Sequence, residues 1–141
     1  MVITILMTLV AACLSAAAQA ANVSVISGNQ VDVGGMLIRL WGIQPPEAEA
    51  MCRRGDMGDV CAVTSRRVLE RLIGKEELRC LVMASQPGEP VVAKCAVYGK
   101  DLGQLMVLSG WATDHSPESS GHYAFEEEVA RGERVGMWKY R

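Results

Sequence analysis

The chain has 141 residues, of which 50% are hydrophobic and 21% are charged, and its formal net charge is −2. This length allows one domain with a substantial core, and the apolar content excludes a chain that is disordered throughout. The slightly acidic balance, without a run of lysine or arginine, argues against a protein that holds nucleic acid through bulk electrostatic attraction.

The first residues carry the pattern of an export signal. Residues 2–20 contain no charged side chain and pass from an apolar run to the small residues Ala18-Gln19-Ala20. A small-x-small ending is typical of a cleavage site, so we expect a signal peptide over 1–20 and a periplasmic or secreted domain over 21–141. Two alternatives stay open. One is a membrane anchor, although the run is short for the ~20 apolar residues that a span needs. The other is lipoprotein processing at Cys13.

Three short strands are expected at the start of the mature chain. Residues 23–26 and 31–33 are rich in valine and isoleucine and are separated by a turn-like Ser-Gly-Asn-Gln. Residues 36–43 follow the pair Gly34-Gly35 and predict a third strand, which Pro45-Pro46 ends because proline cannot continue a ladder.

A helix is expected between the third and fourth strands. Apolar residues recur at helical spacing from 63 to 73, and Asp59 and Gly74 suit the two ends of this helix. Residues 77–83 and 91–98 then predict two more strands, joined by a loop that contains Pro87, Gly88 and Pro90.

Two further helices complete the expected order. Asp101 is predicted to cap a helix over 102–109, residues 116–121 are expected to form a loop, and 122–134 predict an amphipathic third helix. The fold class is therefore α+β and rich in strands, in the order β-β-β-α-β-β-α-α, with five strands that suggest a small barrel.

The cysteines suggest two disulfide bonds. If Cys13 is lost with the leader, Cys52, Cys61, Cys80 and Cys95 remain, and an even number in an exported chain favours disulfides. Cys52 and Cys61 bracket one polar loop, and Cys80 and Cys95 lie in successive expected strands. We therefore predict Cys52–Cys61 and Cys80–Cys95. A zinc site is disfavoured because close CxxC spacing is absent.

Four motifs in the order of the chain resemble the staphylococcal-nuclease (thermonuclease) family. The resemblance covers nearly all of the mature chain, and it implies an OB-fold barrel with flanking helices and, in active members, cleavage of DNA and RNA with calcium. The motifs are IRLWGIQPPE (38–47), DLGQLMVLSGWA (101–112), Tyr123 with Ala130-Arg131, and Gly136-Met137-Trp138.

The resemblance assigns residues to a hydrolytic site, and several of them are altered. Arg39 and Glu47, the proposed base of the family, are retained. The two aspartates that hold the metal in active members are replaced by Asn29 and Gln44, and alignment of the later motif puts Pro90 where a second arginine belongs.

These replacements imply a weakened catalyst. Calcium gains affinity from charged oxygen ligands, so two neutral amides weaken its site. In other phosphoryl-transfer enzymes a catalytic arginine is worth ~10³ to 10⁵ in rate. Lys94 lies four residues beyond Pro90 on the same strand face, ~13 Å away at strand spacing, which is too far for a direct substitute.

The sequence therefore favours an inactive or impaired family member that binds or scaffolds in the cell envelope, in a setting that the resemblance links to exopolysaccharide (succinoglycan) biosynthesis. Its ligand, an oligosaccharide, nucleic acid or protein segment, is not identified by the sequence. We expect a monomer without a membrane span in the mature chain and without a cofactor. The alternative is an active calcium-dependent nuclease or phosphodiesterase that uses Arg39 and Glu47.

Structural interpretations of the same residues stay open. Arg39 and Glu47 are equally compatible with an ion pair that closes the barrel over the Pro-Pro turn. The tryptophans Trp41, Trp111 and Trp138 are interpreted as packing residues, and His115 and His122 as solvated or capping histidines, because neither has a partner at metal-site or triad spacing.

Overall fold

The structure, a computed structural model, describes residues 22–47, 51–52 and 59–140, with only the backbone of 51–52, 59–60 and 140. The predicted signal peptide and Cys13 lie outside the described residues. Within this part of the chain no helix is both long and apolar enough to span a membrane.

The first three strands form the expected antiparallel meander. They are β1 (Val23–Ser27), β2 (Gln30–Val33) and β3 (Met36–Leu40). Alternation along the strands turns Val31, Ile38 and Leu40 into the core, because successive side chains point to opposite faces.

The third strand is shorter than expected. It ends at Leu40, and after Trp41-Gly42 the chain forms β4 (Ile43–Gln44), which pairs with β10 (Thr113–Asp114) instead of extending the meander. Gly42 has φ +75°, a left-handed conformation that glycine adopts without steric cost. A Cβ atom there would lie 3.1 Å from Ser119 and from Tyr123. The prediction of one strand over 36–43 was wrong because the close approach at Gly42 turns the chain.

The remaining long strands complete one mixed sheet. These are β7 (Arg79–Ala84), β8 (Val91–Val97) and β9 (Lys100–Asp101), and the order is β1-β2-β3-β8-β7 with β9 beside β8. Only the β3–β8 pairing among them is parallel. The α+β, strand-rich class is confirmed. The pairings form an open path with β1 and β7 at its ends, so closure into a five-stranded barrel stays a prediction.

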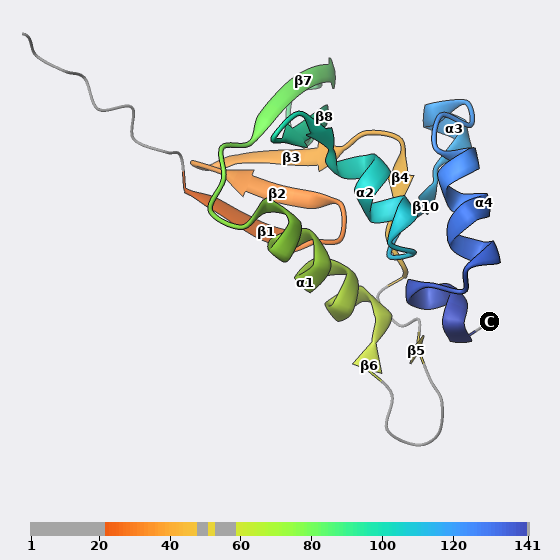
Figure 1. Cartoon of the computed structure of the whole chain (residues 1–141). Coiled ribbons are helices and arrows are strands. Elements are labelled where there is room, and N and C mark those ends of the chain that lie inside the picture. Colours follow the sequence, from red (N-terminus) through yellow and green to blue (C-terminus); the bar gives the residue numbers. More distant parts are fainter. Residues whose placement is uncertain (1–21, 48–50, 53–58, 141) are drawn as a thin grey trace, which may run out of the picture.

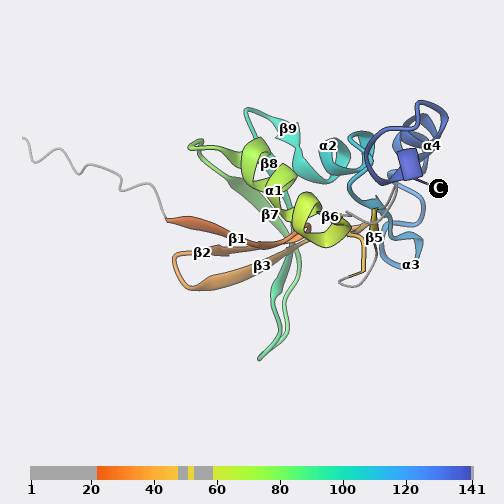
Figure 2. The same ribbon diagram turned by 90° about the horizontal axis from the view of Figure 1, so that it is seen from below.

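The helices lie mainly at one side and one end of this sheet (Figure 1). Helix α1 (Cys61–Ile73) packs on β1 and α2 (Leu102–Leu108) on β8. Figure 2 shows the loop of the β7–β8 hairpin extending beyond the β1–β3 meander, on the side away from α1 and α2. The rest of the helical structure is α3 (Ser116–Ser119), α4 (Ala124–Gly132) and the 3₁₀ turn η1 (Gly136–Tyr140).

Helix ends differ from the sequence expectation in three places. Helix α1 begins at Cys61, because Asp59 pairs in the small ladder of β5 (Met51–Cys52) and β6 (Asp59–Val60) and so does not directly precede the helix. The expected loop over 116–121 contains the short helix α3. The third predicted helix then starts at Ala124 rather than 122, since Ser120 and Gly121 adopt positive φ angles and interrupt the chain. The Asp101 cap of α2 is confirmed.

The core lies between the inner face of the sheet and the two helices that pack on it, α1 and α2. Leu69 of α1 and Leu102 and Met106 of α2 are fully buried, each worth ~1.5–3 kcal/mol by burial of its side chain. They pack with the inward-facing strand residues Val31, Ile38, Leu40, Ala93, Cys95 and Val97.

Candidate functional site

Arg39 stands at the centre of the region that the sequence marked. It faces away from the core on β3, between the inward-facing Ile38 and Leu40, and its backbone is paired with Gln30 on one side and Val92 on the other. The predicted site residues are therefore carried by the outer face of the sheet and by the turns at its edge.

The guanidinium group of Arg39 is held by Glu118 on α3. Nη1 donates to Oε2 at 3.0 Å and Nη2 donates to Oε1 at 2.6 Å, a paired arrangement that is stronger than single neutral hydrogen bonds. The backbone N–H of Gly42 donates to the same carboxylate at 2.7 Å. The Arg39 hydrogen bond lowers the pKa of Glu118, which partial burial alone would raise, and the same bond raises the pKa of Arg39.

Glu118 was missed by the sequence interpretation, which placed it in a loop. It lies 79 positions beyond Arg39, and no local pattern links the two. The one usable signal is Ser116-Pro117-Glu118, since proline and an acidic residue are typical of the first turn of a helix.

Asp114 fixes the short helix that carries Glu118. Its carboxylate accepts hydrogen bonds from Ser119 Oγ at 2.6 Å, Ser116 Oγ at 2.7 Å and the backbone N–H of Tyr123 at 3.0 Å. Partial burial works against the charged form, yet these three donors together lower the pKa of Asp114. These hydrogen bonds hold α3 in the position from which the Glu118 carboxylate bonds to Arg39.

Asn29 is hydrogen-bonded, through its side chain and its backbone carbonyl, to residues of the neighbouring turns. Its Oδ1 accepts from Ser27 Oγ at 3.1 Å, its Nδ2 donates to the Ile43 carbonyl at 3.4 Å, and its own carbonyl accepts from the Leu40 N–H at 2.7 Å. An aspartate could not donate to Ile43. The amide thus has a structural use that ties the β1–β2 turn to the β3–β4 corner.

Neither Gln44 nor Glu47 is a hydrogen-bond or ion-pair partner of Arg39. Gln44 is exposed and contributes backbone pairing with Thr113. Glu47 is exposed, and within the described residues it forms no ion pair. The interpretation of an Arg39–Glu47 pair was wrong, because Glu118 occupies the guanidinium group. In the same part of the chain, no group of three acidic, histidine or cysteine residues could hold a metal ion.

Pro90 and Arg39 do meet in one depression. Its volume is about 440 Å³, and its other lining residues come from the β7–β8 hairpin: Ala84, Ser85, Gln86, Glu89 and Val92. The role that the family resemblance gives to position 90 stays a prediction.

The side chain of Lys94 contacts other residues and does not line that depression. Its Nζ lies 3.0 Å from Nε2 of His122, 3.9 Å from a carboxylate oxygen of Asp101 and 4.9 Å from the ring centroid of Trp41. His122 is exposed, in agreement with its interpretation as a solvated histidine, and its ring also meets Trp41 and Tyr123 edge-on. Lys94 therefore does not line that depression.

The packing interpretation of the tryptophans is supported by their burial. Trp138 is buried, and Trp41 and Trp111 are partly buried against the core. None of the three lines the depression beside Arg39.

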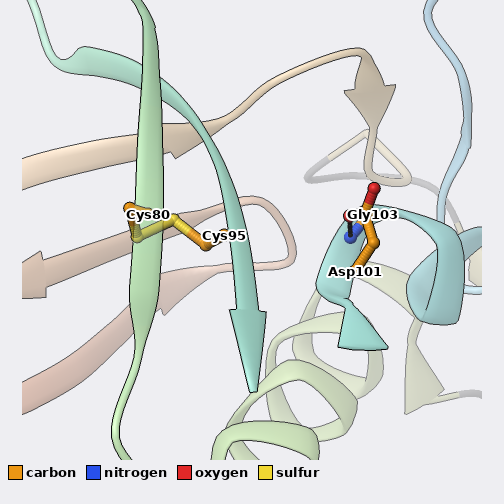
Figure 3. The surroundings of a disulfide bond; sticks show 4 residues. All are labelled: Cys80, Cys95, Asp101 and Gly103. Carbon is orange, nitrogen blue, oxygen red and sulfur yellow. Dashed lines mark hydrogen bonds between the residues drawn. A yellow bond between two sulfur atoms is a disulfide. The ribbon is translucent and has the colours of Figure 1, made fainter. Parts of the chain in front are cut away.

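One of the two predicted disulfides is confirmed. Cys80 and Cys95 are opposite each other on β7 and β8 and are bonded, as Figure 3 shows beside the Asp101 cap of α2. Cys61 is also disulfide-bonded. Its predicted pairing with Cys52 stays a prediction, because the Cys52 side chain lies outside the described residues.

We expect Glu118→Gln to reduce the dependence of stability on pH in the acidic range. The pKa of Glu118 is below its ordinary 4.5, so the ionised pair stabilises the fold above that value and is lost as the pH falls through the lower folded value. The melting temperature of the wild type should therefore fall more steeply below about pH 5 than that of the variant. Thermal melts over this range test it, with the exposed Glu128→Gln as a matched control. Parallel curves for wild type and Glu118→Gln would contradict the pairing.

No protein-family model matches the chain. The chain is 26% identical over 119 residues to the succinoglycan biosynthesis protein ExoI of Rhizobium meliloti (strain 1021), across 82% of this chain and 62% of that protein. The aligned region thus spans less than two thirds of the length of that relative.

Proposed function

We propose that the chain is an exported, staphylococcal-nuclease-like module with an OB-type barrel that binds a ligand in the cell envelope and no longer hydrolyses phosphodiesters. The observation that carries this proposal is the paired hydrogen bonding of Arg39 with Glu118. A guanidinium group bound to a carboxylate is neutralised, so it stabilises a charged phosphate transition state poorly.

The other altered positions support the same conclusion. The Asn29 side chain is bonded to Ser27 and Ile43, and Pro90 supplies no charge to the depression beside Arg39. A site that has lost two carboxylates and one arginine, and whose remaining arginine is paired, lacks the charge that metal-assisted hydrolysis needs.

The setting of the proposed function comes from similarity. The relative is named for succinoglycan biosynthesis, and we extend to this chain only the broad setting of exopolysaccharide biosynthesis. The confirmed disulfide is compatible with an oxidising compartment outside the cytoplasm, where such bonds persist. OB-type domains present a sheet face that suits oligosaccharides as well as nucleic acids.

We expect the purified mature domain to show no turnover of single-stranded DNA or RNA with calcium, magnesium or manganese. Calcium should also leave its melting temperature unchanged, since a ligand that binds only the folded state raises it. Turnover that disappears in Glu47→Gln but survives in Glu128→Gln would overturn the proposal and establish the alternative, an active metal-dependent nuclease.

A restoration experiment tests the reason for inactivity. The triple variant Asn29→Asp, Gln44→Asp and Pro90→Arg restores the family pattern, but Arg39 stays on Glu118, so we expect little cleavage. Adding Glu118→Gln should release the guanidinium group, and the quadruple variant should cleave faster than the triple variant. Equal rates would show that the Glu118 pair does not limit the chemistry.

A further inference from the structure

The depression beside Arg39 is the candidate ligand site. It opens on the outer face of the sheet, where β3 meets β8, and the β7–β8 hairpin forms most of its wall. Its volume of about 440 Å³ is within the usual ~300–1,000 Å³ of small-ligand sites.

Three polar side chains at its rim are without partners in the described part of the chain. Ser85, Gln86 and Glu89 are exposed and form no side-chain hydrogen bond or ion pair there. A backbone bond from the Glu89 N–H to the Gln86 carbonyl, 3.2 Å long, closes the hairpin loop between them. The loop thus brings an amide and a carboxylate to the same rim, where they can donate to and accept from one ligand.

Arg39 adds further donors without adding net charge. A guanidinium group carries five N–H donors, and only two of them are used by Glu118. The positive charge of Arg39 is balanced by the carboxylate of Glu118. The remaining charge at the depression is that of the Glu89 carboxylate, so its net charge is negative. Phosphodiesters and acidic sugars are repelled by such a site, whereas an uncharged ligand is not.

The other part of the lining is apolar. Ala84, Pro90 and Val92 offer aliphatic surface beside the polar rim. A sugar ring has the matching character, because its C–H faces are apolar and its hydroxyl groups at the edge both donate and accept hydrogen bonds. Polar groups that fix orientation above an apolar surface are typical of small-molecule sites.

We propose that this depression binds an uncharged, hydroxyl-rich segment of an oligosaccharide, with Gln86, Glu89 and the outer N–H groups of Arg39 bonding to its hydroxyl groups. The inference rests on the proposed binding function and names the ligand class. The depression shares Arg39 and Pro90 with the nuclease site implied by the family resemblance, but the proposed binding needs neither a metal nor an anion.

Titration calorimetry with two uncharged probes, cellohexaose and laminarihexaose, tests the ligand class. The anionic probes are hexagalacturonate and an oligothymidylate. We expect at least one uncharged probe to bind more tightly than both anionic probes. Absence of binding by both uncharged probes, or tighter binding of an anionic probe, would overturn the inference.

Matched variants test the location. Gln86→Ala and Glu89→Ala should each weaken binding of the uncharged probe about tenfold, which corresponds to ~1.4 kcal/mol for one lost ligand hydrogen bond. The controls Gln104→Ala and Glu128→Ala alter the same side-chain types on α2 and α4 and should leave affinity unchanged. Sugar binding that is insensitive to Gln86→Ala and Glu89→Ala would overturn this location while leaving the proposed binding function intact.

A variant that reverses the charge of Glu89 tests the electrostatic preference for the ligand separately from damage to the hairpin loop. Glu89→Lys changes the balance at the rim from negative to positive, so hexagalacturonate should gain affinity relative to the uncharged probe. An unchanged preference would contradict the electrostatic argument. The nuclease assay stays separate: turnover would defeat the proposed function, and calorimetry alone decides the ligand class.

Discussion

Replacing Tyr123 by alanine should destabilise the fold by ~3–5 kcal/mol, the usual range for deleting a buried aromatic side chain. Tyr123 is only 2% exposed and packs against Trp41 and His122. The close approach of Gly42 to its ring sets the turn that presents the Gly42 N–H to Glu118. A loss of this size is a large fraction of the ~5–15 kcal/mol by which domains are stable.

The hydroxyl group of Tyr123 carries a separate part of this effect. It donates to Oδ2 of Asp101 at 2.8 Å, while Oδ1 of Asp101 accepts from the Gly103 N–H at the start of α2. Burial and the neighbouring Asp101 raise the pKa of Tyr123, so the hydroxyl group stays a donor throughout the physiological range. Tyr123→Phe removes only this bond and should cost ~1–2 kcal/mol.

Urea denaturation of the two Tyr123 variants measures both parts. Phe125→Ala is the control, because Phe125 is an aromatic residue on the neighbouring helix that is 73% exposed, and its loss should change stability by less than about 0.5 kcal/mol. If Tyr123→Phe were as unstable as Tyr123→Ala, the packing of the Tyr123 ring would not be the main source of its stabilising effect. A Phe125→Ala loss equal to that of Tyr123→Ala would contradict the importance of this corner.

Features that depend on local pattern could be predicted from the sequence. The β1–β3 meander followed from valine-rich alternation, and the cap of α2 from an aspartate before a helical repeat. Cys80 and Cys95 were predicted from their places in successive strands, and the register puts them directly opposite. In each case one residue type has a strong preference that neighbouring residues reinforce.

Features that depend on distant contacts could not be predicted in the same way. Glu118 meets Arg39 only after β10 pairs with β4 and α3 folds against Asp114. The break at Trp41-Gly42 depends on how closely Tyr123 approaches Gly42, which the strand-like pattern of 36–43 does not reveal. The family resemblance drew attention to Asn29 and Gln44, but the hydrogen bond from the Asn29 side chain to the Ile43 carbonyl could not be predicted without the fold.

Removing the Cys80–Cys95 bond should cost ~3 kcal/mol, because it closes a chain segment with a sequence separation of 15 and so restricts the unfolded state. The double variant Cys80→Ala with Cys95→Ala tests this in urea without disturbing the Cys61 disulfide. Leu81→Ala is the control, since Leu81 is 68% exposed on the same strand and its loss should change stability little. A double variant as stable as the wild type would contradict the expectation.

The same bond should also affect ligand binding, because β7 is an edge strand whose six residues are all exposed. Such a strand is held by its ladder with β8 and by the disulfide, with little burial to add to them. Without the bond, amide exchange along β7 should accelerate more than along β8, because weakly packed elements open locally. Ala84 ends this strand, and with Ser85 and Gln86, which follow it, lines the depression beside Arg39. The double variant should therefore bind cellohexaose or laminarihexaose more weakly at a temperature where it is still folded, whereas unchanged affinity would show that the hairpin loop is positioned independently of β7.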